Sequence, residues 1–573
     1  MHSRISGWLA LPLALALTTA AAAEPADRIL TGATVVTVNA AQPSAAAIAI
    51  RDGKIVAVGT TAEVLQWQGP QTQVDDLSGR TILPGFIDAH GHITMQARIG
   101  FMRNIAPAPV GTIRNITDLQ REMRIQVASP ITAITGWVLG FGYDDSLLTE
   151  KRHPTRSELD AVSTEKPVVV LHASLHLASA NSKALALAGI TAATPNPPGG
   201  VIRRRAGSQE PDGVLEETAM HMLLGALPAP NLDQTLLTLA VAQQEYAKNG
   251  ITTAQEGAAD AATVAMLEEA ARRDMLKIDV IAFPIWRDAD QALAGRTMGQ
   301  YSNRFKIGGI KLVLDGSPQG KTAFLTHPYH QPPAGLPEDY RGYPMLPAAE
   351  VESYVAEYAA KGWPLLAHAN GDAAADILIA AVGKVADERK VSDHRTVMIH
   401  AQTVREDQLD QMVELGIIPS FFVAHTFYWG DWHRDSVLGR ARAEKISPAH
   451  TAGRKGLRYT FHNDSPVVPP HMTRLIWTGV NRTTRSGQTL GWQERVTPLE
   501  AIQAVTIHAA RQNFEENEKG SIEVGKLADL VVLDGNPLEV APETIDQIAV
   551  VETIKEGKTI YPQPKPAKKK ARK

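Results

Sequence analysis

The stretch PGFIDAHGHI, residues 84–93, is the part of the chain that says most about its fold. Its apolar run ends at Asp88, and His90 and His92 follow at alternate positions. Alternate residues of an extended strand point to the same side. The two imidazoles can therefore bind one ion together at the end of a buried strand.

Outward from this stretch, short apolar runs alternate with helical stretches such as residues 348–362 and 405–416. The strand candidates are KPVVVLHAS, KIDVIAFPI, IGGIKLVLDGS, WPLLAHANGD, TVMIHAQ, IIPSFF and LRYTFHNDSP. This alternation indicates a parallel sheet, and a count near eight favours an α/β fold of the (β/α)8 TIM-like barrel type over a doubly wound sheet. We expect the barrel to span residues 84–515. A segment around 97–245 is too long for one βα unit, so it is predicted to be an insertion over the barrel mouth.

The two ends of the chain carry a different pattern. Residues 24–83 and 516–562 contain short β-branched runs with turn residues between them, as in antiparallel sheets. Two such segments can pair only if the middle of the chain closes on itself and brings its ends together. A small β-sandwich built from both segments is therefore predicted.

Polar side chains stand where several of the strand candidates end. In a parallel barrel these ends converge on one mouth, where catalytic groups collect. The chain has no cysteine, which excludes disulfides, thiolate ligands and a cysteine nucleophile. Four histidines and an aspartate suit zinc, and manganese or iron less well. The candidate ligands are His90, His92, Lys311, His368, His400 and Asp464.

Lys311 differs from the others because a protonated ammonium cannot bind a cation. Burial near cations would lower its pKa, which is about 10.4 in water, and would favour the neutral amine. A neutral amine can take up carbon dioxide and become a carbamate, which is able to bridge two metals. The sequence leaves open whether one or two ions are bound, and two are favoured.

At this point the chain resembles the amidohydrolase superfamily, and in particular its YtcJ-like branch, the amidohydrolase-3 group with the N-substituted formamide deformylases. The similar pieces run from about residue 28 to 560 and include PGFIDAHGH, HLASANSKALALAGI, KLVLDGSPQGKTA, AHANGDAAA, IHAQTV, NDSPV and KGSIEVGKLADLVVLDGNP. The resemblance implies a (β/α)8 barrel with a small β-sandwich from both chain ends.

The resemblance also implies roles for individual residues. His90 and His92 would bind the more buried metal with Asp464, and carboxylated Lys311 would bridge to a second metal. His368 and His400 would bind that second metal. His176 would lie near the substrate.

The leading hypothesis is hydrolysis of a non-peptide carbon–nitrogen bond in a small N-substituted amide or N-acyl compound. Metal-bound hydroxide would attack the carbonyl, and Asp464 would move the proton to the leaving amine. The same site suits a lactone or ester hydrolase, because attack on a carbonyl does not specify the leaving atom. A non-enzymatic exported binding or regulatory protein on this scaffold is the third interpretation.

The stretch FFVAHTFYWGDWHRD, residues 421–435, concentrates aromatic and imidazole side chains after the seventh strand. Such residues in a loop at the barrel mouth could line an apolar or aryl-binding site. Packing beneath a lid is an equally good explanation. His425 and Trp429 are the candidate substrate contacts.

The termini carry targeting and charge features. Residues 1–23 have an early arginine, an apolar stretch and small residues at Ala21 and Ala23, as in a secretory signal peptide. A periplasmic or secreted protein with no membrane span after signal removal is therefore expected. Residues 563–573 are predicted to be a basic disordered tail. Nucleic-acid binding is not expected because no basic stripe with aromatic residues occurs elsewhere. A small-molecule substrate is the expected partner, and a homo-oligomer is left open.

Overall fold

The computed structural model describes residues 24–145, 147–175, 177–198, 200–227, 231–333, 335–389 and 393–562. The expected signal peptide, the basic tail and His176 lie outside the described residues. Across the described ranges, every helix is too short or too polar to cross a lipid bilayer.

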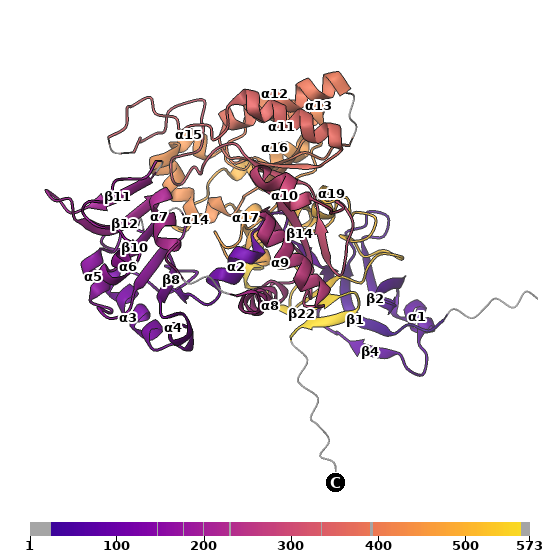
Figure 1. Cartoon of the computed structure of the whole chain (residues 1–573). Helices are drawn as coiled ribbons and strands as arrows, with labels where there is room; N and C mark the ends of the chain where they lie inside the picture. The colour runs from indigo at the N-terminus through magenta and orange to yellow at the C-terminus, as the bar shows by residue number, and fades with distance from the viewer. Residues whose placement is uncertain are drawn as a thin grey trace, which may run out of the picture.

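The central part of the chain contains parallel strands in two sheets, of which the strand β14 is labelled in Figure 1. The first sheet has the order β15-β14-β13-β6 and the second the order β16-β17-β18-β19-β20. The bounds are β6 (Phe86–Ile87), β13 (Ile251–Ala259), β14 (Asp279–Pro284), β15 (Phe305–Ile307), β16 (Ile310–Val313), β17 (Leu365–Ala369), β18 (Val397–His400), β19 (Ile418–Phe421) and β20 (Thr460–Phe461).

Backbone contacts connect these two sheets at both sides. A parallel bridge between Ile285 and Lys311 joins the segment after β14 to β16. On the other side, the Asp464 N–H donates to the His90 carbonyl at 3.0 Å, and the His92 N–H donates to the Ser465 carbonyl at 2.7 Å. The segments after β20 and β6 therefore lie side by side, while closure into an eight-stranded barrel stays a prediction at this stage.

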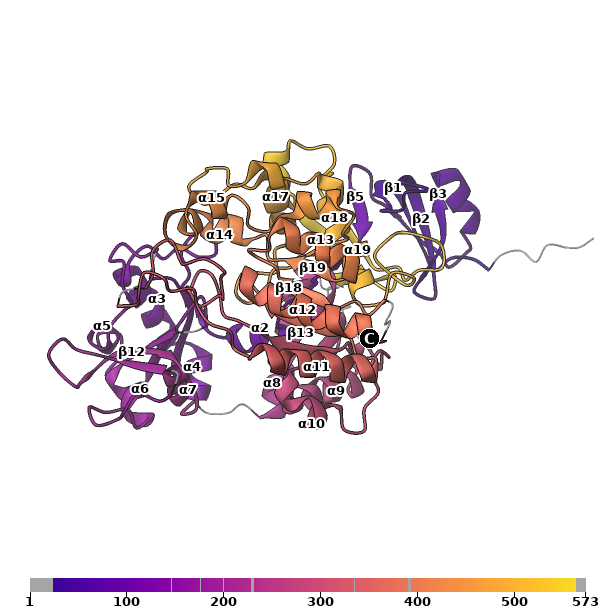
Figure 2. The same ribbon diagram turned by 90° about the horizontal axis from the view of Figure 1, so that it is seen from above.

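Helices follow most of these strands and cover their outer faces. Figure 2 shows α11, α12 and α13 packed next to one another outside the second sheet. Glycines Gly362 and Gly416, both with a positive φ, end α11 and α13, as expected of residues without a Cβ. The helices are α8 (Leu232–Lys248), α9 (Ala261–Arg272), α10 (Ala289–Leu293), α11 (Ala348–Lys361), α12 (Asp372–Arg389), α13 (Glu406–Leu415), α17 (Met472–Asn481), α18 (Pro498–Ala504) and α19 (Ile507–Gln512).

Two of the strand expectations need correction. The run KPVVVLHAS forms β9 (Val168–His172), which lies in a separate sheet and not with the parallel strands of the centre. The strand β13, with the sequence ITTAQEGAA, is absent from the expected set. Its threonines, Gln255 and Glu256 are polar, yet eight of its nine residues are buried because the strand is covered on both faces.

The segment between β6 and β13 contains its own mixed sheet, with the order β11-β12-β10-β9-β8-β7. The strands are β7 (Arg103–Asn104), β8 (Val138–Tyr143), β9, β10 (Leu177–Ala180), β11 (Gly200–Arg204) and β12 (Pro211–Glu217). The strands β7, β8 and β9 are parallel, and β9, β10, β12 and β11 are antiparallel. Apolar clusters around Leu139 and Val170 pack against this sheet. We call this segment the insertion, and its limits at 97–245 stay a prediction.

Strands from both ends of the chain share one sheet, with the order β23-β22-β21-β5-β1-β2-β3 and β4 paired to β1. The strand β21 joins the two ends by pairing antiparallel with β5. The predicted pairing of the chain ends is therefore present, and its division into two sandwich layers stays a prediction. The bounds are β1 (Arg28–Val36), β2 (Ser44–Arg51), β3 (Lys54–Gly59), β4 (Gln73–Asp76), β5 (Thr81–Pro84), β21 (Leu530–Leu533), β22 (Val550–Lys555) and β23 (Lys558–Tyr561).

Candidate metal centre

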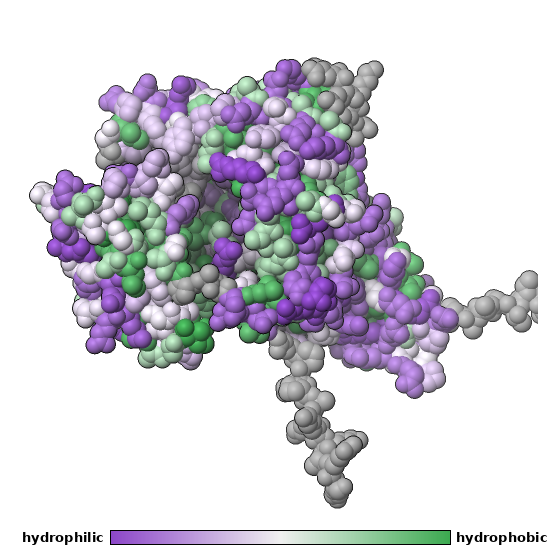
Figure 3. Space-filling view, viewed as in Figure 1, coloured by the Kyte–Doolittle hydropathy of each residue, from purple (hydrophilic) through white to green (hydrophobic). Residues whose placement is uncertain are grey.

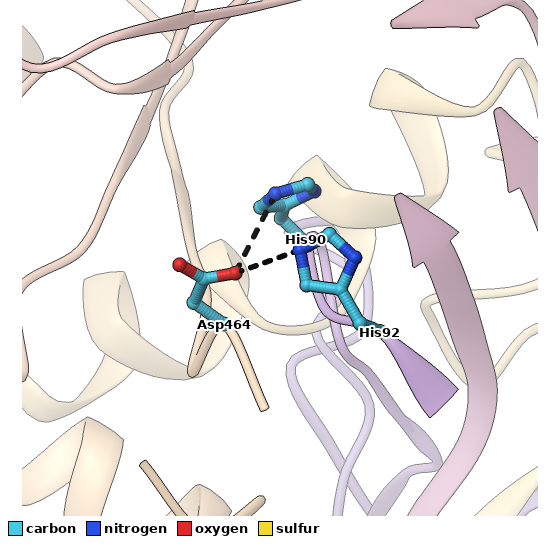
Figure 4. A group of neighbouring side chains, drawn as sticks. All are labelled: His90, His92 and Asp464. Atoms are coloured by element: carbon cyan, nitrogen blue, oxygen red, sulfur yellow. Dashed lines mark ion pairs between the residues drawn. The ribbon is translucent and has the colours of Figure 1, made fainter. Parts of the chain in front are cut away.

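The two histidines of the opening stretch face one carboxylate, that of Asp464 beyond β20 (Figure 4). Nε2 of His90 is 3.6 Å from Oδ1 of Asp464, and Nε2 of His92 is 3.2 Å from the same oxygen. One ligand atom from each of the three residues lies within 4.8 Å of the others. This is the spacing that donors around a single ion require.

Lys311 of β16 adjoins this group. Its Nζ is 3.0 Å from Nε2 of His90, and the side chain is buried. Burial lowers the pKa of Lys311 to about 8, although the charge of Asp464 acts in the opposite direction. Lys311 therefore loses its proton to form the neutral amine at a lower pH than a lysine at the protein surface does.

The remaining two predicted ligands face each other. Nδ1 of His368, on β17, is 3.0 Å from Nε2 of His400, at the end of β18. The ring of His400 is 5.7 Å from that of His90, between ring centroids. The structure thus brings all six predicted ligand side chains together, with Lys311 inside β16 and the other five at or just after the carboxyl ends of central strands.

The backbone at this edge has an unusual conformation. His400, Ala401 and Asp464 have φ angles of 75°, 43° and 53°, in a region that side chains with a Cβ rarely adopt. Such a conformation costs about 1–3 kcal/mol per residue and tends to occur at functional sites, where surrounding contacts hold it. Here it turns the chain sharply at the ends of two strands.

The titration behaviour of the group follows from burial and from its carboxylates. Burial lowers the pKa values of His90 and His400 well below the ordinary value. Burial acts the same way on His92, but contacts with Asp464 and Glu256 outweigh it and raise the pKa to about 9. Burial opposes ionisation of Asp464, yet its imidazole neighbours hold the pKa well below the usual range. The site therefore stabilises positive charge next to Asp464.

Two further residues of the centre were not among the predicted ones. Glu256 of β13 lies with Oε1 3.5 Å from Nδ1 of His92, and its Oε2 accepts hydrogen bonds from the backbone and hydroxyl of Thr94. His462 places Nε2 3.1 Å from Nδ1 of His400 and Nδ1 2.9 Å from the Ser420 hydroxyl. Both contact imidazoles of the predicted ligands, as partners beyond the ligands of a metal site commonly do.

A sequence signal exists for only one of them. His462 alternates with Asp464 in the run YTFHNDSP, as His90 does with His92, so strand periodicity could have found it. Glu256 stands in a strand that the hydrophobic pattern does not reveal.

The stretch after β19 forms α14 (His425–Trp432) and continues as a short π-helix, η3 (His433–Val437). His425 is buried, with its ring 4.5 Å from Phe422 and 4.7 Å from Trp429. Phe422 in turn lies 5.9 Å from the ring of His400. The two candidate substrate contacts, His425 and Trp429, therefore adjoin the centre through Phe422. The space-filling view shows a hollow between the insertion and the barrel region (Figure 3).

Nδ1 of His425 is 2.9 Å from Nε2 of His433, and both rings are buried and stacked. Burial lowers the pKa of His433 to about 3 and that of His425 well below its ordinary value. Both imidazoles are therefore neutral, and one proton lies between them. This contact fixes the orientation of the His425 ring beside the centre.

Comparison with known proteins agrees with this geometry. The sequence model of the amidohydrolase family matches residues 73–561. The chain is 30% identical to N-substituted formamide deformylase of Arthrobacter pascens, over 93% of this chain and 98% of that protein. It is 24% identical to the putative amidohydrolase YtcJ of Bacillus subtilis (strain 168), over 90% of this chain and 96% of that protein.

The fold agrees as well. The crystal structure of an uncharacterized metal-dependent hydrolase from Pyrococcus horikoshii OT3 superposes with a TM-score of 0.73 at 22% identity, covering 90% of this chain and 99% of that one. The central strands therefore have the TIM-barrel-like arrangement of amidohydrolase structures. The chain belongs to the amidohydrolase family and is a metal-dependent hydrolase of carbon–nitrogen bonds other than peptide bonds.

Proposed function

We propose that this protein hydrolyses the amide bond of a small N-substituted amide or N-acyl compound. The observation that carries the proposal is the convergence, described above, of six candidate donor side chains from five central strands or the segments that follow them. The relatives support the choice of bond, because one is named a deformylase of N-substituted formamides.

The donor set fits a divalent metal. Oδ1 of Asp464 is buried and makes no hydrogen bond to any described residue. A cation bound between this oxygen and the two imidazoles would offset the cost of burying it. We assign one ion to His90, His92 and Asp464 and a second to His368 and His400, and propose zinc because the donors are nitrogen and oxygen. When bound, such ions lower the pKa of coordinated water and polarise a carbonyl oxygen.

Lys311 is proposed to be carboxylated and to bridge the two ion positions. Its neutral amine nitrogen bonds to the carbon of carbon dioxide and releases one proton to water, so that the neutral amine becomes an anionic carbamate. Support comes from its buried position 3.0 Å from His90 and from its lowered pKa of about 8. The resulting carboxylate would balance charge that the buried imidazoles cannot.

Asp464 is proposed to move the proton. Its depressed pKa keeps it ionised at neutral pH, so it can accept the proton of the attacking water. It then donates this proton to the amide nitrogen, which leaves as an amine. One carboxylate between His90 and His92 thus serves both halves of the reaction.

His425 and Trp429 are proposed to line the substrate pocket, with an apolar or aryl group against Trp429. His176 is proposed to contact substrate, on the resemblance alone. We further propose that the central strands close into a (β/α)8 barrel, that residues 1–23 direct export to the periplasm or outside the cell, and that the end sheet forms the sandwich.

The experiment that tests this function is a substrate panel of N-formyl amines, acyl anilides, N-acyl amino acids and lactones, assayed on zinc-loaded protein. We expect turnover of at least one amide class, and a decrease of at least about 10²-fold in Asp464→Asn with its fold retained in circular dichroism. Thr473→Ser, a conservative change on α17, is the matched control. Hydrolysis of lactones alone, or Asp464→Asn with normal rates, contradicts the proposal.

A further inference from the structure

A second group of carboxylates and imidazoles lies in the insertion. Asp144 and Asp145 follow β8 directly, and His172 ends the neighbouring parallel strand β9. Nε2 of His172 is 3.2 Å from Oδ1 of Asp145 and 3.9 Å from Oδ1 of Asp144. One ligand atom from each of the three lies within 4.8 Å of the others. The carboxyl ends of parallel strands are a recurrent place for ligands, as at the barrel centre.

A fourth side chain completes the group. Nε2 of His153 is 3.6 Å from Oδ2 of Asp145. Its Nδ1 is 3.0 Å from the hydroxyl of Tyr143, which is 3.3 Å from the Ser179 hydroxyl. Histidines that bind metals have one ring nitrogen held by such a partner, so that the other points to the ion. His153 has this arrangement.

An ionised carboxylate among largely buried side chains makes a cation favourable at this position. The side chains of His153, His172 and Asp144 are 7%, 12% and 9% exposed. Burial lowers the pKa of His153 to about 4, so this imidazole is neutral. Burial opposes ionisation of Asp145, but the two histidines hold its pKa near 2. An ionised carboxylate thus stands among largely buried groups, and Nε2 of His172 is a buried atom without a hydrogen bond in the described part of the chain.

We propose that Asp144, Asp145, His153 and His172 bind a divalent cation in the insertion, separate from the catalytic centre. Two imidazole nitrogens and two carboxylate oxygens are a donor set suited to zinc. Binding through Nε2 places the proton of His172 on Nδ1, where the Ser174 hydroxyl, 2.8 Å away, accepts it. The bond from the Ser174 backbone N–H to Nδ1 is lost in this step. The ion ties the end of β8 to the end of β9.

Metal content of the purified full-length protein, measured after equilibration with zinc alone and gel filtration, tests this site. His172→Gln and Asp145→Asn are each expected to contain one zinc ion fewer per chain than the parent protein. His221→Gln, at an exposed histidine of α7 (Thr218–Leu224) in the same insertion, is the matched control and is expected to keep the parent content. Circular dichroism checks that each variant is folded, and two variants keep the test usable if one does not fold.

A barrel variant separates this proposal from the proposed function. His90→Gln/His92→Gln is expected to lose zinc from the catalytic centre and to keep the ion of the insertion. Subsequent His172→Gln in that background is expected to remove the ion that remains. Equal zinc content in His172→Gln, Asp145→Asn and the parent overturns the site in the insertion, whatever the outcome for the catalytic centre.

Discussion

The absence of a side chain at Gly257 leaves room for the imidazole of His90 to face Asp464. Gly257 follows Glu256 in β13, and a Cβ at this position would lie 2.3 Å from Cε1 and 2.6 Å from Nδ1 of His90. The backbone angle of Gly257 is an ordinary one, so the constraint is space alone. A residue without a side chain is required because the strand passes directly beneath the ring.

Gly257→Ala is therefore expected to displace His90 and to lower both metal content and turnover, at a cost of about 1–3 kcal/mol in stability. Zinc content and urea unfolding measure the two effects. Gly383→Ala, on α12, is the control, because nothing lies closer than 3.7 Å to its added Cβ. That variant should match the parent or exceed its stability by about 0.5–1 kcal/mol. Normal zinc content in Gly257→Ala would show that the ring has room to move.

The contact between His433 and His425 leads to a second prediction at this scale. His433→Leu removes the partner of Nδ1 and leaves the buried His425 ring without an orienting hydrogen bond. We expect kcat/KM to fall about tenfold, the equivalent of about 1.4 kcal/mol. His433→Gln keeps an amide N–H near the same position and should retain most of the activity. Equal losses in both variants would assign His433 to packing alone.

At the level of elements, buried ion pairs join the barrel to the end sheet. Asp279 begins β14, and its carboxylate contacts Lys519 and, at 3.0 Å, Lys555 of β22. Lys555 also lies 2.9 Å from Asp529, just before β21. All of these side chains are buried. The segment that contains Lys519 and Lys555 is thereby attached to the N-terminal end of β14, at the opposite end of the central strands from the candidate metal centre.

Lys519→Met is expected to lower the free energy of unfolding by about 3–5 kcal/mol, because it leaves the carboxylate of Asp279 without one of its two buried cations. Chemical denaturation gives this number directly. Lys248→Met, at an exposed lysine of α8 that pairs with Glu245, is the control and should change stability by less than about 1 kcal/mol. A similarly small effect in Lys519→Met would mean that water reaches Asp279.

The same network sets a pH dependence. Burial opposes ionisation of Asp279, but Lys519 and Lys555 lower its pKa to about 2, below the value of about 3.9 in an unfolded chain. A lowered pKa stabilises the fold above pH 4, and this contribution is lost as the pH falls from about 4 toward 2. Between these values Asp279→Asn should show a pH slope of stability smaller than that of the parent by about 1 kcal/mol per pH unit. An unchanged slope would contradict the lowered pKa.

For the whole molecule, the centre joins segments that are far apart in sequence. His90 and His92 follow β6, and Asp464 follows β20, so an ion bound as proposed would connect the first and last central strands. An ion that binds the folded chain and not the unfolded one adds about 2.7 kcal/mol of stability at a hundredfold excess over its Kd.

Chelation is therefore expected to lower the melting temperature of the protein by a few degrees, and added zinc should restore it. Differential scanning calorimetry with and without a chelator measures the change. The His90→Gln/His92→Gln variant should respond less than the parent, because it lacks the ion between the strands. A chelator effect of equal size in both proteins would locate the stabilising ion elsewhere.

The sequence by itself determined the family and the pairing of the two chain ends, and it predicted the six candidate donor residues. These features depend on local patterns, such as two histidines at alternate positions after an apolar run, and on polar residues where buried strands end. Tertiary structure alone decided that β9 belongs to the insertion, that the polar strand β13 belongs to the centre, and that Glu256 and His462 contact the imidazoles of His92 and His400. The physical reason is that burial and hydrogen bonding between residues distant in sequence override the local hydrophobic pattern.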